Sequence, residues 1–423
     1  MNAPADSAQL PVLIIGAGMA GLTCACYLYR AGRAVHVLDA ADAVGGRVRT
    51  DLTPDGFRLD RGFQVLLTAY PEVQRMIDYG ALQLNAFTSG AVIRLPEGRE
   101  TTLRNPLRQP LRALGAVGAP IGSMADKLRI VSLAQHVRQH SSDELLRREA
   151  TDTLTFLRRY GWSERMIDTF FRPFFGGIYL DRELTTASNF FEFVFKQFAE
   201  GDAALPARGM QTIPEQLAAR LPAGAVELHA RVTAIDGHTV RLADGRTLRG
   251  RAVVLATDGP AAQHLVPQLA AAEPQASRQT TCTYFAADRS PGRGDGLLRL
   301  NATPSALAHN VAFPSDVAPE YAPVGQTLVS VSTHGDYGLS DDALAERLRL
   351  ELTAWFGHGV AGWRRLGTYH IQHALPAYEA GQPVQLPLEL TEGLYRCGDW
   401  ASYPSLNAAM ATGRQVAERL LAQ

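Results

Sequence analysis

The sequence predicts an α/β protein in which a discontinuous nucleotide-binding domain is interrupted by an inserted α+β substrate domain. Three observations lead to this prediction: a glycine-rich strand–helix–strand unit near the N-terminus, alternating strand patterns in the middle of the chain, and a final strand followed by a helix. The 423 residues suffice for two to three domain-sized cores. A composition with 46% hydrophobic and 20% charged residues excludes disordered and fibrous classes.

We expect five consecutive segments to build the two domains. The nucleotide-binding domain takes residues 1–86, 205–270 and 372–423, and the substrate domain takes a mainly helical segment, 87–204, and a sheet segment, 271–371.

The first unit is predicted from an apolar run followed by glycines. Val12–Ile15 is typical of a buried parallel strand, Ala20–Arg30 of a helix that ends before Gly32, and Ala34–Leu38 of a second strand closed by Asp39. A strand, a helix and a strand within about 30 residues predict a βαβ unit.

The later elements are predicted from periodicity and turn residues. Residues 226–256 alternate in character around two Asp-Gly turns, which predicts a strand over 226–235, two hairpins and a buried strand. Further strands are predicted at Thr280–Ala286, Thr327–Ser332 and Gly393–Cys397, and further helices at Ser340–Phe356 and Ser405–Leu421.

The glycine pattern Gly16-x-Gly18-x-x-Gly21 predicts a dinucleotide site because a strand precedes it and a helix opens within it. Gly16 permits the tight turn, Gly18 lets the backbone approach a diphosphate, and Gly21 lets the helix pack closely on the strand. The helix N-terminus offers free N–H groups to phosphate oxygens. Asp39, 18 residues after Gly21, is placed to accept hydrogen bonds from an adenosine ribose.

A second motif, Gly45-Gly46-Arg47, follows directly after this unit. Two glycines allow the backbone to pass close to a phosphate, and the guanidinium of Arg47 is suited to grip it. A solvated surface turn is the alternative, but the position after a dinucleotide unit favours a phosphate contact.

These motifs resemble a known superfamily. The segments V-L-I-I-G-A-G-M-A-G-L, V-H-V-L-D-A and V-G-G-R-V-R-T, with G-L-Y-R-C-G-D-W and S-L-N-A-A-M-A-T-G-R-Q-V-A near the C-terminus, resemble FAD-dependent amine oxidases, protoporphyrinogen oxidases and phytoene desaturases. That superfamily usually has Glu where this chain has Asp39. The resemblance implies a Rossmann-type FAD-binding domain. It also implies that Asp399 contacts the ribitol and that the helix starting near Ala408–Met410 points at the flavin.

The glycine motifs and this resemblance together give a set of expected FAD-binding residues. Two further members come from the segment Arg58–Leu67, which looks like the stretch that runs as a strand beside the flavin, and one from the backbone contact to adenine. The set is Gly16, Gly18, Ala20, Gly21, Asp39, Gly45, Gly46, Arg47, Gly62, Phe63, Val232, Gly398, Asp399, Ala408, Ala409 and Met410. We expect the FAD to be non-covalent, with Cys397 a buried thiol. A single dinucleotide fingerprint and no redox-active cysteine pair argue against a disulfide reductase fed by a nicotinamide nucleotide.

The substrate side predicts an apolar substrate. Flavin amine oxidases place a lysine near flavin N5, but the strand where the resemblance puts it, Thr280–Phe285, has none, and the chain has only Lys127 and Lys196. Ten of the 16 phenylalanines lie between Phe156 and Phe198, either as core, which is the more common role of such a block, or as the walls of a tunnel.

The sequence therefore predicts hydride transfer from a carotenoid-like or porphyrinogen-like substrate to flavin N5, with oxygen or a quinone as electron acceptor. The weak catalytic candidates are Arg61, which binds either a substrate carboxylate or a neighbouring acid, and Tyr378. Three alternatives stay open. The first is an amine oxidase with a cage of Tyr378, Trp400 and Tyr403, the second a redox-neutral polyene isomerase, and the third a flavin-holding scaffold without turnover.

Partners and location follow from charge and cysteine use. A net charge of −1 argues against nucleic-acid binding, and we expect no metal site because the pair His370-x-x-His373 has no third ligand nearby. Unpaired cysteines and the absence of a secretory signal pattern predict a cytoplasmic protein. Residues 103–125, apolar with flanking arginines, are either a solvated loop, the interpretation favoured here, or a peripheral contact with an anionic membrane. The oligomeric state stays open.

Overall fold

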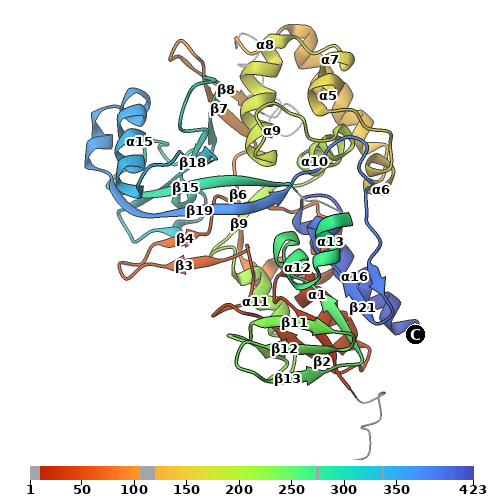
Figure 1. The fold of residues 1–423 in the computed structure, drawn as a ribbon. Coiled ribbons are helices and arrows are strands. Elements are labelled where there is room, and N and C mark those ends of the chain that lie inside the picture. The colour runs from red at the N-terminus through yellow and green to blue at the C-terminus, as the bar shows by residue number, and fades with distance from the viewer. Residues whose placement is uncertain (1–9, 105–119, 273–275, 336) are drawn as a thin grey trace, which may run out of the picture.

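The computed structural model describes residues 10–104, 120–272, 276–335 and 337–423 (Figure 1). Two large sheets dominate it. A six-stranded sheet lies in the lower part of Figure 1, a seven-stranded sheet lies above it, and a group of helices covers the upper right. The mixed α/β class predicted from the sequence is confirmed.

The six-stranded sheet collects strands from three distant parts of the chain. Its strands, in spatial order, are β10 (Val226–Glu227), β2 (Val35–Leu38), β1 (Val12–Ile15), β14 (Ala252–Leu255), β21 (Leu394–Arg396) and β20 (Glu389–Thr391). All pairings are parallel except that of β20 with β21. β1 and β14 are buried on both faces, which explains why both are uninterrupted apolar runs.

The two faces of this sheet are covered differently. Helices α1 (Met19–Arg30) and α16 (Leu406–Leu421) pack together on one face with Val12 and Ile14. They approach closely because a Cβ at Gly413 would lie 2.3 Å from the Ala20 carbonyl oxygen. A small antiparallel sheet covers the other face, made of β11 (Val232–Asp236), β12 (Thr239–Leu242) and β13 (Thr247–Arg249). The N-terminal and C-terminal segments are thereby held side by side.

The predicted strand over 226–235 is wrong in its continuity. It is divided into β10, which pairs with β2, and β11, which starts the two predicted hairpins. His229 between them has φ 56°, and the Ala230 N–H donates to the Asp39 carbonyl. A residue in the left-handed region cannot continue a strand, so the chain changes sheets there.

The seven-stranded sheet is mainly antiparallel. Its strands, in spatial order, are β19 (Arg364–Pro376), β15 (Ser277–Ala287), β18 (Thr327–His334), β17 (Asn310–Ala312), β16 (Leu298–Asn301), β7 (Gly90–Arg94) and β8 (Glu100–Arg104). One face packs its valines and Phe285 against helix α15 (Asp341–Phe356). The opposite face carries Thr280, Asn310, Tyr369 and Ile371 and borders a cavity.

The prediction that 87–204 is mainly helical needs two corrections. β7 and β8 form a hairpin at the edge of the seven-stranded sheet, and β9 (Ala203–Pro206) pairs with β5 (Leu66–Leu67) and β6 (Leu84–Ala86). The helices described in this segment are α5 (Met124–Arg138), α6 (Ser142–Leu146), α7 (Thr153–Tyr160), α8 (Glu164–Met166), the π-helix η3 (Ile167–Phe171), α9 (Arg172–Tyr179) and α10 (Ser188–Glu200). Most of the phenylalanine block serves as core, with its rings packed in edge-on, tilted and stacked pairs, while Phe174 and Phe198 line the cavity.

The expected continuous strand Arg58–Leu67 is also divided. β4 (Arg58–Asp60) pairs with β3 (Thr50–Leu52), and β5 begins at Leu66. Gly62 between them has φ 95° and turns the chain along the cavity. The remaining elements are α2 (Pro71–Met76), α3 (Tyr79–Leu82), α11 (Thr212–Ala218), α12 (Gly259–Leu265), α13 (Pro267–Ala272), α14 (Pro314–Val317) and the 3-10 helices η4 (Pro319–Tyr321), η5 (His358–Gly362) and η6 (Asp399–Ala401).

The helices of the described part of the chain were compared with the requirements for crossing a membrane. No helix there combines the length and the apolar character that crossing a bilayer requires. Most of the expected peripheral contact at 103–125 lies outside the described residues, because 105–119 are not among them.

Candidate functional site

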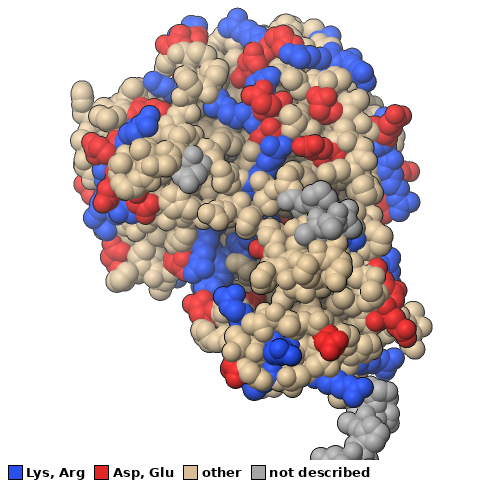
Figure 2. All heavy atoms as spheres, in the orientation of Figure 1, with Lys and Arg blue, Asp and Glu red and all other residues tan. Residues whose placement is uncertain are grey.

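A cavity of about 1180 Å³ extends from the carboxyl ends of the six-stranded sheet to the inner face of the seven-stranded sheet. Figure 2 shows a hollow between these two parts of the molecule, with Lys and Arg side chains at its edge. Its lower part is lined by Gly16, Gly18, Met19, Ala20, Asp39, Gly45, Gly46, Arg47, Val232, Gly398, Asp399, Ser405, Leu406 and Ala409. Its upper part is lined by Phe63, Phe87, Phe174, Gly177, Ile178, Leu298, Leu300, Asn310, Tyr369, Ile371 and Leu375.

The first glycine turn leaves space at one position only. A Cβ at Gly16 would lie 2.7 Å from the Ala256 carbonyl oxygen, and one at Gly21 would lie 2.0 Å from the Gly16 carbonyl oxygen. A Cβ at Gly18 meets no described atom within 4 Å and would enter the cavity. No side chain of the described residues caps α1, so its first N–H groups are left for an acceptor in that space.

The second glycine motif lies directly beside the first. The Gly45 N–H donates to the Ala17 carbonyl at 2.9 Å, and a Cβ at Gly46 would be 3.5 Å from the Cα of Gly18. Gly45 has φ 117° and Gly46 has φ 60°. Two backbone segments therefore form one wall of the cavity without side chains between them.

Asp39 is held at the end of β2. One carboxylate oxygen accepts from the Ala17 N–H at 2.6 Å and the other from the Ala41 N–H at 2.8 Å. Each oxygen has a second lone pair, and Asp39 lines the cavity, so it can still accept a ligand hydroxyl.

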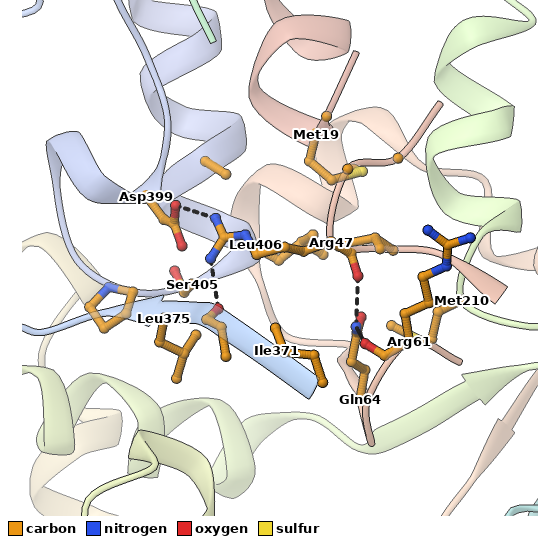
Figure 3. A pocket seen from close by; sticks show the side chains of 18 of the residues that line it. Met19, Arg47, Arg61, Gln64, Met210, Ile371, Leu375, Asp399, Ser405 and Leu406 are labelled. Carbon is orange, nitrogen blue, oxygen red and sulfur yellow. Dashed lines mark hydrogen bonds and ion pairs between the residues drawn. The ribbon is translucent and has the colours of Figure 1, made fainter. Parts of the chain in front are cut away.

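Arg47 and Asp399, which the sequence assigns to separate ligand contacts, contact each other (Figure 3). The Arg47 guanidinium donates to Asp399 at 2.5 Å and to the Ala374 carbonyl at 2.7 Å, and the Arg47 carbonyl accepts from Gln64 at 2.8 Å. The Asp399 side chain is only 5% exposed, which makes this charge-assisted bond its compensation for burial.

Helix α16 begins at the cavity. It starts at Leu406, one residue after the predicted Ser405, and the Ser405 hydroxyl accepts from the Ala408 N–H. Ser405, Leu406 and Ala409 line the cavity, so the positive end of the helix dipole faces it. Three expected ligand residues, Gly21, Ala408 and Met410, are buried in the packing behind and do not line it.

Four further residues of the expected set belong to the cavity wall. Ala20, Gly62, Phe63 and Val232 all line the cavity. Cys397 does not; burial raises the pKa of its thiol, and all four cysteines are buried and unpaired.

Arg61 binds a neighbouring acid. Its guanidinium donates to both carboxylate oxygens of Asp51, at 2.9 and 3.0 Å, and the Tyr369 hydroxyl donates to Asp51 at 2.8 Å. Burial raises the pKa of Asp51, but the bonds from Arg61 and Tyr369 outweigh it and lower the pKa overall. Asp51 and Tyr369, which sequence reasoning missed, join Arg61 on the cavity wall.

The other candidates lie away from the cavity. Tyr378 packs edge-on to Phe190, Tyr403 packs on Phe193, and Trp400 donates to the Thr257 carbonyl. None of the three lines the cavity, so they form no aromatic cage there. Both lysines are also outside it, and Lys196 pairs with Glu200 at 2.5 Å in α10.

The apolar wall of the cavity was mostly missed by sequence reasoning. Ile371 and Leu375 come from β19, which was not predicted as a strand, and Leu298 and Leu300 come from β16. The alternation L-R-L in β16 was an available signal, but its short length made it ambiguous. Within the described ranges, no group of three or more His, Cys, Asp or Glu residues is arranged to hold a metal ion.

Comparison with known proteins gives a family match over nearly the whole chain. The model of the family described as flavin-containing amine oxidoreductase matches residues 19–421. A curated relative, 15-cis-phytoene desaturase of Arabidopsis thaliana, is 38% identical over 84 residues, which are 20% of this chain. The match spans only 14% of that relative's length.

Solved structures share the fold over almost their full length. A protein from Exiguobacterium sp. 255-15, provisionally assigned as a protoporphyrinogen oxidase, superposes with a TM-score of 0.75 at 18% identity, covering 99% of this chain and 100% of that one. A putrescine oxidase bound to putrescine superposes with a TM-score of 0.70 at 16% identity, covering 98% and 99%. At these identities the likeness shows the fold alone.

Proposed function

Since this chain belongs to the flavin-containing amine oxidoreductase family and is therefore a flavin oxidoreductase, we propose that it removes hydride from an apolar substrate of the carotenoid or porphyrinogen type. The proposed cofactor is non-covalent FAD, held by the six-stranded sheet as a Rossmann-type domain. Oxygen or a quinone is the proposed electron acceptor. The observation that carries the proposal is the apolar upper cavity, where none of the described lining residues is a lysine.

The residues present fit FAD. A Cβ at Gly18 would enter open space, whereas a Cβ at Gly16 or Gly21 would clash with backbone atoms. The N-terminus of α1 points to the space beside Gly18. A diphosphate needs both this space and these N–H groups. Asp39 lies at the end of the neighbouring strand, where the ribose of a dinucleotide is bound.

Each part of the cofactor has residues that would hold it. The diphosphate would take the N–H groups of α1 and the second glycine motif, and the adenosine would lie between Asp39 and Val232. Arg47 and Asp399 would bind the middle of the molecule, and the N-terminus of α16 would face the ring. When bound, FAD supplies the hydride acceptor and passes the electrons on to oxygen or a quinone.

The chain's own contribution is position and exclusion of water. Phe174, Ile178, Leu300 and Ile371 offer an apolar surface on which a conjugated substrate can lie. The Asp51–Arg61 pair satisfies its own charges at the cavity wall and leaves no single charge uncompensated. Cleavage of an allylic or porphyrinogen C–H bond needs this placement more than a strong base, because conjugation delocalises the developing positive charge.

The test is flavin reduction without oxygen. The holoenzyme is mixed anaerobically with a carotene, a porphyrinogen, and a panel of primary and secondary amines, while the visible flavin absorbance is followed. We expect the absorbance to bleach with a carotene or porphyrinogen and to persist with the amines. Bleaching by amines alone would overturn the proposal in favour of an amine oxidase, and double-bond rearrangement without an acceptor would favour the isomerase.

A further inference from the structure

A tyrosine hydroxyl on the cavity wall has no partner in the described part of the chain. Two tyrosines among the described residues line the cavity, and the hydroxyl of one of them, Tyr369, donates to Asp51. The other, Tyr70, is only 8% exposed, and its hydroxyl makes no hydrogen bond to any described residue. Because buried hydroxyl groups in native proteins are usually paired, the missing partner of Tyr70 calls for an explanation.

The unpaired hydroxyl is open to the cavity. The hydroxyl of Tyr179 is also unpaired but is completely enclosed, whereas the hydroxyl of Tyr70 keeps accessible surface. Tyr70 lines the cavity together with Val65 and Leu67, which precede it on the chain. A molecule bound in the cavity can therefore reach the Tyr70 hydroxyl beside an apolar wall.

The surroundings hold the ring of Tyr70 in place. The ring stacks on Phe193 of α10, with centroids 6.0 Å apart and 10° between the planes. The Tyr70 N–H donates to the Leu67 carbonyl at 3.1 Å, and Pro71, the first residue of α2, restricts the backbone of Tyr70. Burial raises the pKa of Tyr70, so the hydroxyl keeps its proton at neutral pH and can act as a hydrogen-bond donor.

We propose that Tyr70 donates a hydrogen bond to a carbonyl oxygen of an apolar molecule bound in the cavity. The inference rests on the proposed function and names the class of ligand more closely. Two kinds of molecule carry this chemistry: a substrate with a ketone group, and a quinone that accepts the electrons.

The number of hydrogens favours a carbonyl over a hydroxyl group on the ligand. Tyr70 and a ligand hydroxyl bring two hydrogens to one contact, so one hydrogen would lack an acceptor beside the apolar wall. A carbonyl oxygen brings no hydrogen and accepts the one that Tyr70 offers. An ionised carboxylate would accept it too, but loss of its hydration costs far more than burial of a neutral carbonyl.

The first experiment compares three ligands that share one carbon skeleton. Oxidised holoenzyme is titrated without oxygen with geranylacetone, with the alcohol made by reducing its ketone, and with the parent hydrocarbon, and Kd is taken from the change in the flavin spectrum. We expect the ketone to bind about tenfold more tightly than the hydrocarbon, and more tightly than the alcohol, as one hydrogen bond predicts. Equal affinity of the ketone and either analogue would overturn the inference.

Variants assign the preference to Tyr70. Tyr70→Phe deletes only the unpaired hydroxyl, so it should abolish the preference by weakening the ketone alone. Tyr79→Phe is the matched control, since the Tyr79 hydroxyl donates to the Thr68 carbonyl and Tyr79 does not line the cavity. The infrared C=O band of bound geranylacetone should lie at lower frequency in the wild type and in Tyr79→Phe than in Tyr70→Phe. A preference or a band position that Tyr70→Phe leaves unchanged would overturn the inference.

The stability of the ligand-free protein gives a further measurement. Because the Tyr70 hydroxyl has no partner among the described residues, Tyr70→Phe should melt no earlier than the wild type. Earlier melting would show that the hydroxyl is paired inside the protein, and the inference would then fail. The comparison of the three ligands on the wild type decides the question independently of any variant.

A second arm separates the two kinds of ligand. Reduced holoenzyme is mixed anaerobically with duroquinone, which takes up two electrons and two protons as the flavin is reoxidised. A tenfold higher half-saturating quinone concentration in Tyr70→Phe assigns the contact to the electron acceptor, and an unchanged one assigns it to a ketone-bearing substrate. A carbonyl preference without flavin reduction by a carotene or porphyrinogen would overturn only the proposed function. Such reduction without a carbonyl preference would overturn only this inference.

Discussion

The two ends of the cavity are built in opposite ways. One wall of the lower end is backbone: Gly18, Gly45 and Gly46 present N–H groups and open space, and each belongs to a short continuous motif. The upper end is side chain: Phe174, Leu300 and Ile371 come from a helix and two strands far apart in sequence. A diphosphate needs a fixed array of donors, which a local turn can supply, whereas an apolar substrate needs a shaped surface, which only packed elements can supply.

The first prediction should have the largest effect. It tests whether FAD binding needs the open space beside Gly18, with folding measured separately. Gly18→Val should give a folded protein that binds FAD about 100-fold more weakly, because the side chain occupies the phosphate space and costs at least two charge-assisted hydrogen bonds. The measurement is the flavin-to-protein absorbance ratio beside circular dichroism. Gly362→Val is the control, since a Cβ there also meets no described atom within 4 Å but lies away from the cavity. Unchanged flavin content in Gly18→Val would contradict the assignment.

The second prediction concerns the side-chain pair at the lower end. Arg47→Met should weaken FAD binding by about 10-fold or more, because one charged hydrogen bond is lost and the Asp399 carboxylate is left buried without its partner. Fluorescence titration of the apoprotein measures this. Arg58→Met, which removes a guanidinium that donates to the Glu320 carbonyl outside the cavity, should leave the affinity unchanged.

The third prediction concerns the upper end of the cavity, where a substitution should lower activity and leave flavin binding unchanged. Ile178→Trp adds volume to the cavity wall, so kcat/KM for the apolar substrate should fall about tenfold, an overpacking cost of about 1–3 kcal/mol, while flavin content stays normal. Ile130→Trp on α5, outside the cavity, is the matched control. Loss of flavin together with activity would show that the two ends are not independent.

The last prediction concerns stability instead of ligand binding, at Asp60, which is buried and does not line the cavity. Burial raises the pKa of its carboxyl to about 6, although Thr50, the Met210 N–H and Tyr321 donate to it. The unfolded chain has a pKa of about 3.9 at this group, so between about pH 4 and 6 the folded protein binds more protons. Stability contributed by Asp60 is therefore present below about pH 4 and lost as the pH rises through about 6, by roughly 3 kcal/mol.

Chemical unfolding of wild type and Asp60→Asn across this range checks the sign. The difference in unfolding free energy, wild type minus variant, should fall as the pH rises, since the amide of the variant cannot titrate. A constant difference from about pH 4 to about pH 7 would show that Asp60 keeps an ordinary pKa in the folded protein.

Sequence reasoning succeeded where the determinant is local. β1, α1 and β2 follow from one apolar run, one glycine turn and a second apolar run, and Asp39 comes with them. It was less successful where a residue's role depends on distant partners. His229, in the left-handed region, divides a strand that alternation alone predicts as continuous. β19 was missed because its residues are mostly exposed or half-buried without clear alternation, and it forms a strand by pairing with β15.

The candidate site shows the same division. Thirteen of the 16 expected ligand residues line the cavity, and the three that do not, Gly21, Ala408 and Met410, belong to the right motifs but face the packing behind. The sequence left two partners open for Arg61, a substrate carboxylate or a neighbouring acid. In the structure, its bidentate contact with Asp51 shows that the partner is a neighbouring acid. Tyr378, Trp400 and Tyr403 are aromatic residues near the C-terminal motif in sequence, yet packing turns all three away from the cavity.

The glycine-rich turn, the α/β class and the resemblance to flavin oxidoreductases could be predicted from the sequence, because backbone conformation at glycines and strand periodicity depend on a few neighbouring residues. Which side chains line the upper cavity, and that Arg47 contacts Asp399 across 352 positions of chain, became known from the folded structure. A cavity wall forms where surfaces from distant parts of the chain pack together. The residues that line the wall become neighbours through burial and strand register, and neither burial nor register can be derived from their separation in the sequence.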